Sequence, residues 1–201
     1  MPPDTTASYA ARLPQERPLG LRLASRRHAW YRLDEQTPRT WSWRPFPAPR
    51  HRFDPAGGSL RVRYFADSPR AAMRERFDAE GRVVSAHHLE HRLVEITGTL
   101  RVLDLRSDRV LDALGLDDQI STSRAPGVWA ACQQLTELAH SWYGDRLHAI
   151  AYRSRTTPQR STNLALLAPA HVGVRDLGPL RRQEALLTAL VTSDGFAVES
   201  W

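Results

Sequence analysis

Cysteine is almost absent from this sequence, since Cys132 is the only one among 201 residues. One thiol cannot build the intrachain disulfide framework that supports many small secreted domains. The first residues also lack the basic, apolar and small-residue order of a signal peptide, and no apolar run is long enough to span a membrane. We therefore expect a cytoplasmic protein that has no membrane partner.

Lysine is missing altogether, so all 28 basic residues are arginines. With 22 acidic residues the net charge is +6, which invites a nucleic-acid interpretation. An all-arginine set is explained by coding bias better than by the choice of a partner, and no nucleic-acid-binding motif accompanies it. We expect no direct contact with nucleic acid.

The positive charge is concentrated in residues 17–63, where 11 arginines stand against three acidic residues. This segment carries +8, so the rest of the chain sums to about −2. Arg32 and Arg52 lie within it, and such a local field favours the approach of an anionic ligand.

The length fits one globular domain, and 41% hydrophobic residues are enough for a sizeable core. Residues 1–20 are rich in proline and are predicted to form an N-terminal arm, with a single domain over residues 21–201. The sequence has no G-x-G-x-x-G fingerprint and no G-x-S-x-G nucleophile turn. A Rossmann-type dinucleotide site and a serine hydrolase are therefore not supported.

One stretch in the first half of the chain places several chemical groups on a strand, a turn and a helix. The LRVRYF segment alternates apolar and basic side chains, as a strand with one apolar face does. Ser68 then offers an N-cap and Pro69 suits the first turn of a helix, which would carry Glu75 about two turns further on. Because neighbouring elements usually pack together, Arg52, Tyr64 and Glu75 can face one cleft.

These three side chains suit a nucleotide-sugar substrate. The guanidinium of Arg52 presents a planar fork for phosphate, and the ring of Tyr64 can stack on a base. A carboxylate such as Glu75 can stabilise the positive charge that develops on a ribose when its glycosidic bond breaks. The spacing also fits a structural alternative, in which Glu75 lies on a solvated helix face and Tyr64 only ends a core strand.

The remaining pattern predicts an α/β (α+β) domain with a mixed central sheet. Apolar residues recur at steps of three and four from residue 127 to 142, and Cys132 belongs to this stripe, so we expect it to be a packing residue. Trp41 and Trp43 stand in a proline-punctuated loop and are expected to anchor it on the core. Strands are expected at residues 29–33, 88–96, 100–105, 147–152, 163–167, 171–174 and 195–198, and helices at 108–114, 127–142 and 180–191.

Three histidines, His87, His88 and His91, raise the question of a metal site. On a strand, His88 and His91 would point to opposite faces, and no complete ligand set accompanies them. We therefore predict no metal site.

Several short motifs, in order, resemble the RES domain, a family named for its Arg, Glu and Ser. Arg32 closes a Tyr-Arg pair, and Arg52 opens an Arg-Phe-Asp turn that is followed by two glycines. Tyr64 is followed eleven positions later by Glu75, and Ser154 comes shortly after an apolar strand.

The resemblance covers about residues 28–170 and includes Asn163, which precedes a further apolar strand. One departure is Asp54, which stands where the family commonly has Asn. Another is the Pro-Arg-His sequence before Arg52, where the family often has a pair of glycines.

The resemblance implies a compact mixed-sheet fold like that of the ADP-ribosyltransferases, with a cleft for NAD as a consumed substrate and with no cofactor. It implies a toxin of a type II toxin–antitoxin pair that cleaves the nicotinamide–ribose bond of NAD, with water or phosphate as acceptor. Arg32 and Arg52 would hold phosphates or ribose, Tyr64 would position the nicotinamide end, and Ser154 would support the same NAD pocket. Glu75 would stabilise the transition state, with Arg52 and Tyr64 completing the catalytic set.

The implied partner is a cognate antitoxin with a helix-turn-helix-like domain, and a homodimer is an open alternative. Two other functions also stay open. An ADP-ribosyltransferase that modifies a protein would share the same donor site and differ only in the acceptor. A non-catalytic nucleotide- or nucleic-acid-binding module would use the cleft without turnover.

Overall fold

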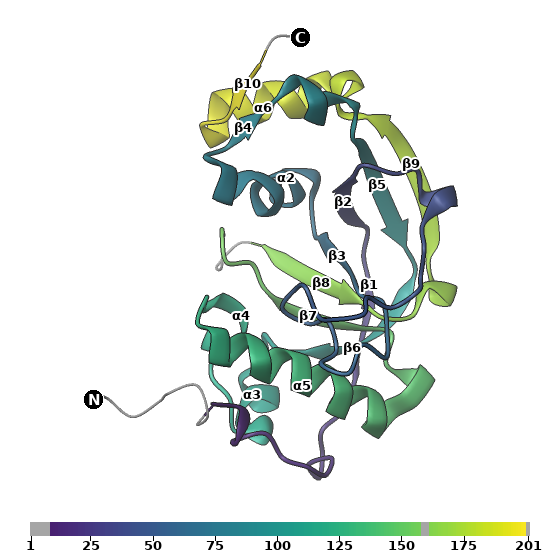
Figure 1. The fold of residues 1–201 in the computed structure, drawn as a ribbon, viewed down its shortest axis with the longest axis vertical. Helices are drawn as coiled ribbons and strands as arrows, with labels where there is room; N and C mark the ends of the chain where they lie inside the picture. Colours follow the sequence, from purple (N-terminus) through teal and green to yellow (C-terminus); the bar gives the residue numbers. More distant parts are fainter. Residues whose placement is uncertain (1–8, 158–160, 200–201) are drawn as a thin grey trace, which may run out of the picture.

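The computed structural model describes residues 9–157 and 161–199, which form a mixed α/β domain. Its centre is an eight-stranded sheet in the order β1-β6-β7-β8-β3-β2-β5-β9 (Figure 1). Strands β6 and β7 pair in parallel, and the other neighbours in this sheet pair antiparallel. The predicted α/β class with a mixed sheet is confirmed. The strands are β1 Ala24–Arg27, β2 Trp30–Asp34, β3 Arg63–Ala66, β5 Arg92–Thr97, β6 Thr99–Asp104, β7 Ala149–Arg153, β8 Thr162–Leu166 and β9 Gly173–Pro179.

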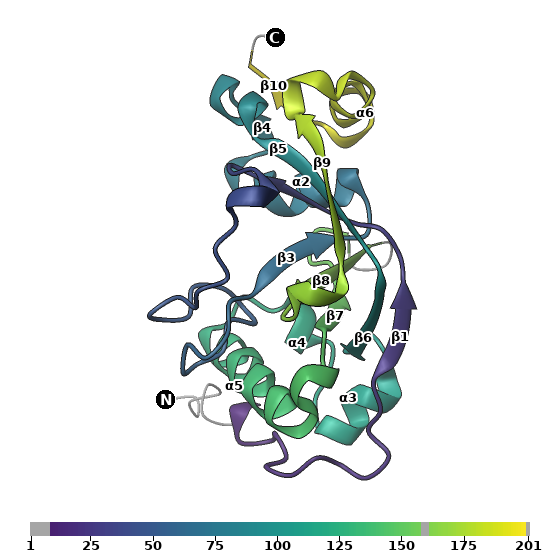
Figure 2. The same cartoon turned by 90° about the vertical axis from the view of Figure 1, so that its right-hand side faces the viewer.

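The helices gather at the two ends of the molecule. In Figure 1, α3, α4 and α5 lie together at one end and α2 and α6 at the other, with the middle strands between them. Figure 2 shows that the sheet is curled, because the strands turn progressively from β1 and β6 towards β5 and β9. Among the described residues, no helix has the length and apolar character needed to cross a membrane. The helices are α2 Pro69–Phe77, α3 Asp108–Leu114, α4 Gln119–Thr122, α5 Pro126–Tyr143 and α6 Glu184–Asp194.

Helix α5 packs through the stripe that the sequence predicts. Val128, Cys132, Leu135 and Ala139 are buried in one cluster with residues of β6, β7 and α3. Burial raises the pKa of the Cys132 thiol to about 12, so the reactive thiolate is strongly disfavoured. Cys132 is therefore a packing residue, as predicted.

A second cluster lies on the other face of the sheet and includes the tryptophan loop. Trp41 and Trp43 pack against a group that contains Phe65 and residues of β6, β7 and β8. The rings of Trp41 and Phe65 meet edge to face at 6.2 Å. The prediction that these tryptophans anchor the loop on the core is confirmed.

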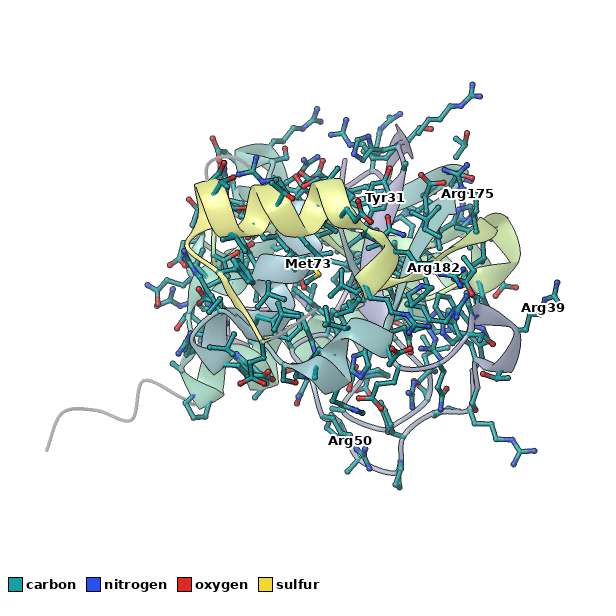
Figure 3. The ribbon with its side chains drawn as sticks, turned by 90° about the horizontal axis from the view of Figure 1, so that it is seen from above. Tyr31, Arg39, Arg50, Met73, Arg175 and Arg182 are labelled. Carbon is teal, nitrogen blue, oxygen red and sulfur yellow. The ribbon has the colours of Figure 1, made fainter. Side chains whose placement is uncertain are left out.

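The third cluster joins α2 to α6. Met73 and Phe77 of α2 are fully buried and pack with Leu187 and Leu190 of α6. Seen from above, Met73 lies beneath α6 (Figure 3). The short strands β4 (Val83–Val84) and β10 (Ala197–Val198) pair in parallel as a separate ribbon beside these helices.

The strand predicted at residues 88–96 begins too early. His88 lies in the 3₁₀ helix Ala86–Glu90, where its ring Nδ1 is 2.9 Å from Ser85 Oγ, and β5 begins only at Arg92. The rings of His87 and His88 each come within 5.0 Å of the His91 ring, so the expectation that His88 and His91 point to opposite faces is wrong. Within residues 9–157 and 161–199, however, no three His, Cys, Asp or Glu side chains are arranged to hold a metal ion.

The sequence prediction omits one edge strand of the sheet, β1, and makes the other, β9, too short. Strand β1 was not predicted, and β9 runs to Pro179 although only residues 171–174 were expected. Both are largely exposed and polar, so they lack the apolar alternation that marks an inner strand. The strand expected at 195–198 pairs with β4 and not with the main sheet.

From Tyr9 onwards the N-terminal segment packs against the α3–α5 end of the domain. Tyr9 and Leu13 are buried there, and the Tyr9 hydroxyl donates a hydrogen bond to Asp117 Oδ1 at 2.9 Å. The division into an arm over residues 1–20 and a domain over 21–201 stays a prediction, and residues 1–8 lie outside the described part of the chain.

Candidate active site

A cavity of about 340 Å³ opens where β2, β3, α2, α5, β7 and β8 converge. Four of the five predicted site residues line it: Arg32, Arg52, Tyr64 and Glu75. The fifth, Ser154, is fully buried and contacts the Glu75 carboxylate directly. The fold therefore brings all five predicted residues to one place.

Glu75 is delivered by a helix whose start is fixed locally. Ser68 Oγ accepts a hydrogen bond from the backbone N–H of Ala71 at 3.2 Å, and Pro69 occupies the first helical position. The opposite side of α2 is held against the end of α6, because Arg70 and Arg74 both donate to the buried carboxylate of Asp194. The direction of the Glu75 side chain is thus set by a capped and anchored helix.

The carboxylate of Glu75 is held from the other half of the molecule. Ser154 Oγ donates a hydrogen bond to Glu75 Oε1 at 2.6 Å, and Thr156 Oγ1 donates to the same oxygen at 3.1 Å. The backbone N–H of Thr157 in turn donates to Ser154 Oγ at 3.0 Å, which fixes the hydroxyl. Among the described residues Glu75 Oε2 has no hydrogen-bond donor, so one oxygen is positioned while the other is available to a ligand.

Ser154 therefore acts on Glu75. Its exposed fraction is 0%, and its hydroxyl is engaged with the carboxylate and with Thr157. The predicted direct contact of Ser154 with NAD stays a prediction. The family resemblance placed Ser154 in the site, and its position just beyond the end of β7 brings it to the Glu75 carboxylate.

Arg52 uses much of its guanidinium fork inside the protein. Its Nη1 donates to the carbonyl of Ile120 at 2.8 Å and its Nη2 to the carbonyl of Ser123 at 2.6 Å. The group also lies over the Trp129 ring, 5.6 Å from its centroid. Arg52 thus ties its loop to α4, and the phosphate contact expected of it stays a prediction.

Tyr64 is also bonded internally, through Asp54. Its hydroxyl donates to Asp54 Oδ1 at 3.0 Å and accepts from the N–H of Phe53 at 2.9 Å. Asp54 Oδ2 accepts from the backbone N–H groups of Arg50 and His51, both at 2.9 Å. An Asn has only one side-chain acceptor oxygen, so the Asp at this position closes the turn with bonds that an Asn could not all accept.

The Tyr64 phenol stays protonated. Burial raises its pKa well above the ordinary value, and the charge of Asp54 raises it further. The ring meets the His51 ring edge to face at 5.4 Å, and both side chains line the cavity. Tyr64 can therefore present its ring to a ligand, while its hydroxyl holds the loop.

Arg32 is one of four arginines that line the cavity, with Arg52, Arg76 and Arg155. Its Nε is 2.9 Å from Asp34 Oδ2, and Arg63 Nη1 approaches the same carboxylate oxygen at 3.3 Å. Burial lowers the pKa of Arg32, and the charge of Asp34 opposes this effect. Two guanidinium groups share one carboxylate, so an excess of one positive charge remains beside the cavity to attract an anion.

Sequence reasoning gave no role to three further cavity residues, Trp129, Tyr152 and Asn163. Tyr152 and Asn163 are directly opposite each other on β7 and β8, and both are buried. Asn163 Oδ1 has no hydrogen-bond partner among the described residues. In the sequence, Asn163 stands out only as a residue of the resemblance that precedes an apolar strand. No local pattern shows which strands will pair with it.

The model of the RES domain family matches residues 29–187 of this chain. The chain belongs to the RES domain family. The match extends slightly further towards the C-terminus than the resemblance over residues 28–170 that the motifs indicate. It includes β2, β3, α2, β7 and β8, which supply most of the cavity wall.

This RES domain is also similar in fold to a chain in the crystal structure of the M. tuberculosis MbcT–MbcA toxin–antitoxin complex. The two are 18% identical, with a TM-score of 0.53 over 92% of this chain and 98% of that one. No curated protein matches the sequence. The similarity shows a shared fold, which agrees with the family match.

Proposed function

We propose that this RES domain is a toxin that consumes NAD by cleaving the bond between nicotinamide and ribose. The observation that carries the proposal is the carboxylate of Glu75, fixed through Oε1 by two hydroxyl groups in the wall of a cavity. A fixed anion is most useful to a reaction in which positive charge develops beside it. Cleavage of a glycosidic bond is such a reaction.

The proposed chemistry follows from where the electrons go. When the bond between C1 of the ribose and the nicotinamide nitrogen breaks, both electrons leave with the nicotinamide, which becomes neutral. The ribose becomes an oxocarbenium ion, and Glu75 stabilises that charge. Water then bonds to C1 and loses a proton, which gives ADP-ribose, or inorganic phosphate bonds there and gives the phosphate ester of ADP-ribose.

The remaining cavity residues would bind the rest of the dinucleotide. The excess positive charge at Arg32 and Arg63 suits the diphosphate or the ribose oxygens. The Tyr64 ring offers an aromatic surface at the nicotinamide end. Arg52 would contribute the donors that its carbonyl contacts leave free.

A cognate antitoxin is the proposed partner. Support comes from the likeness to a chain in a toxin–antitoxin complex, although that likeness concerns the fold. A helix-turn-helix-like domain in the antitoxin, a homodimer of this chain and a cytoplasmic location stay predictions.

Mass spectrometry of NAD after incubation with the purified protein tests the proposed reaction. We expect free nicotinamide together with ADP-ribose, or with its phosphate ester when phosphate is present. An ADP-ribosylated protein with little free ADP-ribose would identify the transferase alternative. Intact NAD in the presence of folded protein would contradict the proposal and favour a binding module.

A further inference from the structure

Asn163 is a buried polar residue of the cavity whose hydrogen bonding is incomplete. It is 3% exposed, and its Oδ1 has no donor among the residues that the structure describes. A buried acceptor without a donor is unfavourable, and native proteins contain few of them. In a cavity wall, such an atom indicates where a ligand supplies the missing N–H or O–H.

The sheet holds this acceptor in a defined position. On β8, Asn163 is paired with Tyr152 of β7 on one side and with Ala66 of β3 on the other. Both neighbours also line the cavity. Cross-strand partners share one face of a sheet, and the small Ala66 side chain leaves room beside the amide.

Asn163 and the Glu75 carboxylate line the same cavity, and β7 connects them. Tyr152, the cross-strand partner of Asn163, lies two residues before Ser154. An amide oxygen can only accept a hydrogen bond, so Oδ1 requires a donor from the ligand. The Tyr152 strand continues to Ser154, which holds Glu75.

We propose that Asn163 Oδ1 accepts a hydrogen bond from the carboxamide NH₂ of nicotinamide and thereby selects the amide form of the dinucleotide. This inference rests on the proposed function, because it uses Glu75 to place the reacting ribose carbon. The nicotinamide ring is bonded to that carbon, so the leaving group is the part of NAD that must lie beside Glu75. The adenine amine lies at the far end of the dinucleotide.

Asn163 should favour NAD over its acid analogue because the analogue has no hydrogen-bond donor on its pyridine substituent. Nicotinic acid adenine dinucleotide carries a carboxylate in place of the carboxamide, so it presents two acceptors and no donor. Its carboxylate would face Asn163 Oδ1 without a hydrogen bond and would also be repelled by Glu75. Sites that are built to hydrogen-bond a donor group reject analogues without it strongly.

The test compares kcat/KM for NAD and for nicotinic acid adenine dinucleotide. We expect wild-type protein to prefer NAD by about a hundredfold or more. Asn163→Leu should reduce this ratio to below about tenfold, mainly through loss of activity on NAD. Thr136→Val is the matched control, because it also removes a buried polar group, one bonded only to the Cys132 carbonyl in α5, and should leave the ratio unchanged.

A second variant covers the case in which Asn163→Leu fails to fold. Asn163→Ser keeps a polar side chain at this position of β8, but it is too short to place an oxygen where Oδ1 lies. The preference for NAD should then fall about tenfold or more, with the melting temperature little changed. Equal cleavage of both dinucleotides by wild-type protein, or an undiminished preference in folded Asn163→Leu, would overturn the assignment.

Melting temperatures measured with free nicotinamide and with free nicotinic acid test the role of Asn163 independently of the proposed reaction. Nicotinamide should raise the melting temperature of wild-type protein more than nicotinic acid does, and Asn163→Leu should abolish the difference. If NAD is not cleaved but this difference is present, the proposed reaction is wrong and the role of Asn163 is supported. If NAD is cleaved while both bases act equally on wild-type protein, the role of Asn163 is wrong and the reaction stands.

Discussion

Two regions of the cavity wall use their polar groups in opposite ways. One is the Glu75 corner, made of Glu75, Ser154 and Thr156, and the other is the loop that carries Arg52. At the Glu75 corner, hydroxyl groups from the end of β7 bond to one carboxylate oxygen and leave the other for a ligand. At the loop, the guanidinium of Arg52 and the hydroxyl of Tyr64 are bonded to protein groups. The first region presents a charge to the cavity, while the second builds the wall around it.

Residues of one family pattern can therefore have unlike tasks. Replacement in the Glu75 corner should affect the rate of the reaction more than the stability of the fold. Replacement in the loop should affect stability more than the chemical step.

Glu75→Gln should have the largest effect. The amide keeps the size of the side chain and some of its hydrogen bonding but removes the charge that faces the oxocarbenium ion. NAD turnover should fall by about a hundredfold or more, which corresponds to about 3 kcal/mol of transition-state stabilisation. NAD consumption and melting temperature are measured on the same samples.

Glu90→Gln is the control for that change. Glu90 is largely exposed, and within the described part of the chain its one ion pair is with Arg181, at 3.2 Å, so turnover should be unaffected. If Glu75→Gln is as active as this control, Glu75 is a solvated helix residue and the proposed enzyme activity has no basis.

Ser154→Ala should have a smaller effect on the same step. It removes the 2.6 Å hydrogen bond to Glu75 Oε1 and the restraint on the carboxylate. Hydrogen bonds to charged groups contribute about 1.5–3 kcal/mol, so kcat should fall by about tenfold or more while KM changes little. A rise in KM with normal kcat would instead assign Ser154 to direct NAD binding. Ser141→Ala, which removes an exposed hydroxyl that donates to the Leu138 carbonyl in α5, serves as the control.

Arg52→Lys should act mainly on stability. A lysine cannot reach both the Ile120 and the Ser123 carbonyl, so at least one buried hydrogen bond is lost. A loss of about 1–2 kcal/mol lowers the melting temperature of a protein this size by about 2–8 °C. We also expect a severalfold weaker capture of NAD, measured as KM.

The comparison for this variant is Arg50→Lys, because Arg50 is exposed and its side chain lies over the Phe46 ring at the surface. Both the melting temperature and KM should stay at the wild-type values there. A lysine at position 52 that matched the parent in both quantities would show that neither the wall nor the ligand needs the guanidinium.

Acidification should have the smallest and most gradual effect, through Asp194. Hydrogen bonds from Arg70 lower the pKa of this buried carboxyl below 3.8, burial opposes them, and Arg74 adds to the lowering. Because the folded-state pKa is lowered, the stabilisation is fully present above the unfolded pKa and is lost as pH falls through the folded value. Between about pH 5 and pH 2, part of the loss in melting temperature should therefore disappear in Asp194→Asn. The same loss in wild type and variant would show that the α2–α6 contact does not depend on this charge.

Much of the local structure could be predicted because neighbouring residues decide it. Ser68 and Pro69 fix the start of α2, and the apolar stripe of α5 shows which side is buried. The edge strands β1 and β9 could not be predicted in full, since exposed polar strands carry little hydrophobic pattern. The prediction that His88 and His91 point to opposite faces was wrong because residues 86–90 form a 3₁₀ helix where a strand was expected.

By itself the sequence determined the helix that carries Glu75 and the packing role of Cys132, and its motif order named five residues that the fold brings together. Those depend on short-range periodicity, capping and motif order. The tertiary structure alone decided that Ser154, 79 residues from Glu75, holds its carboxylate, and that Arg52 bonds to the backbone carbonyls of Ile120 in α4 and of Ser123 just after it. The order of strands around β8 decided that Asn163 lies between Tyr152 and Ala66 in the cavity wall. The physical reason is that hydrogen bonds between distant segments depend on which strands pair, and strand pairing is a property of the whole sheet that no single segment encodes.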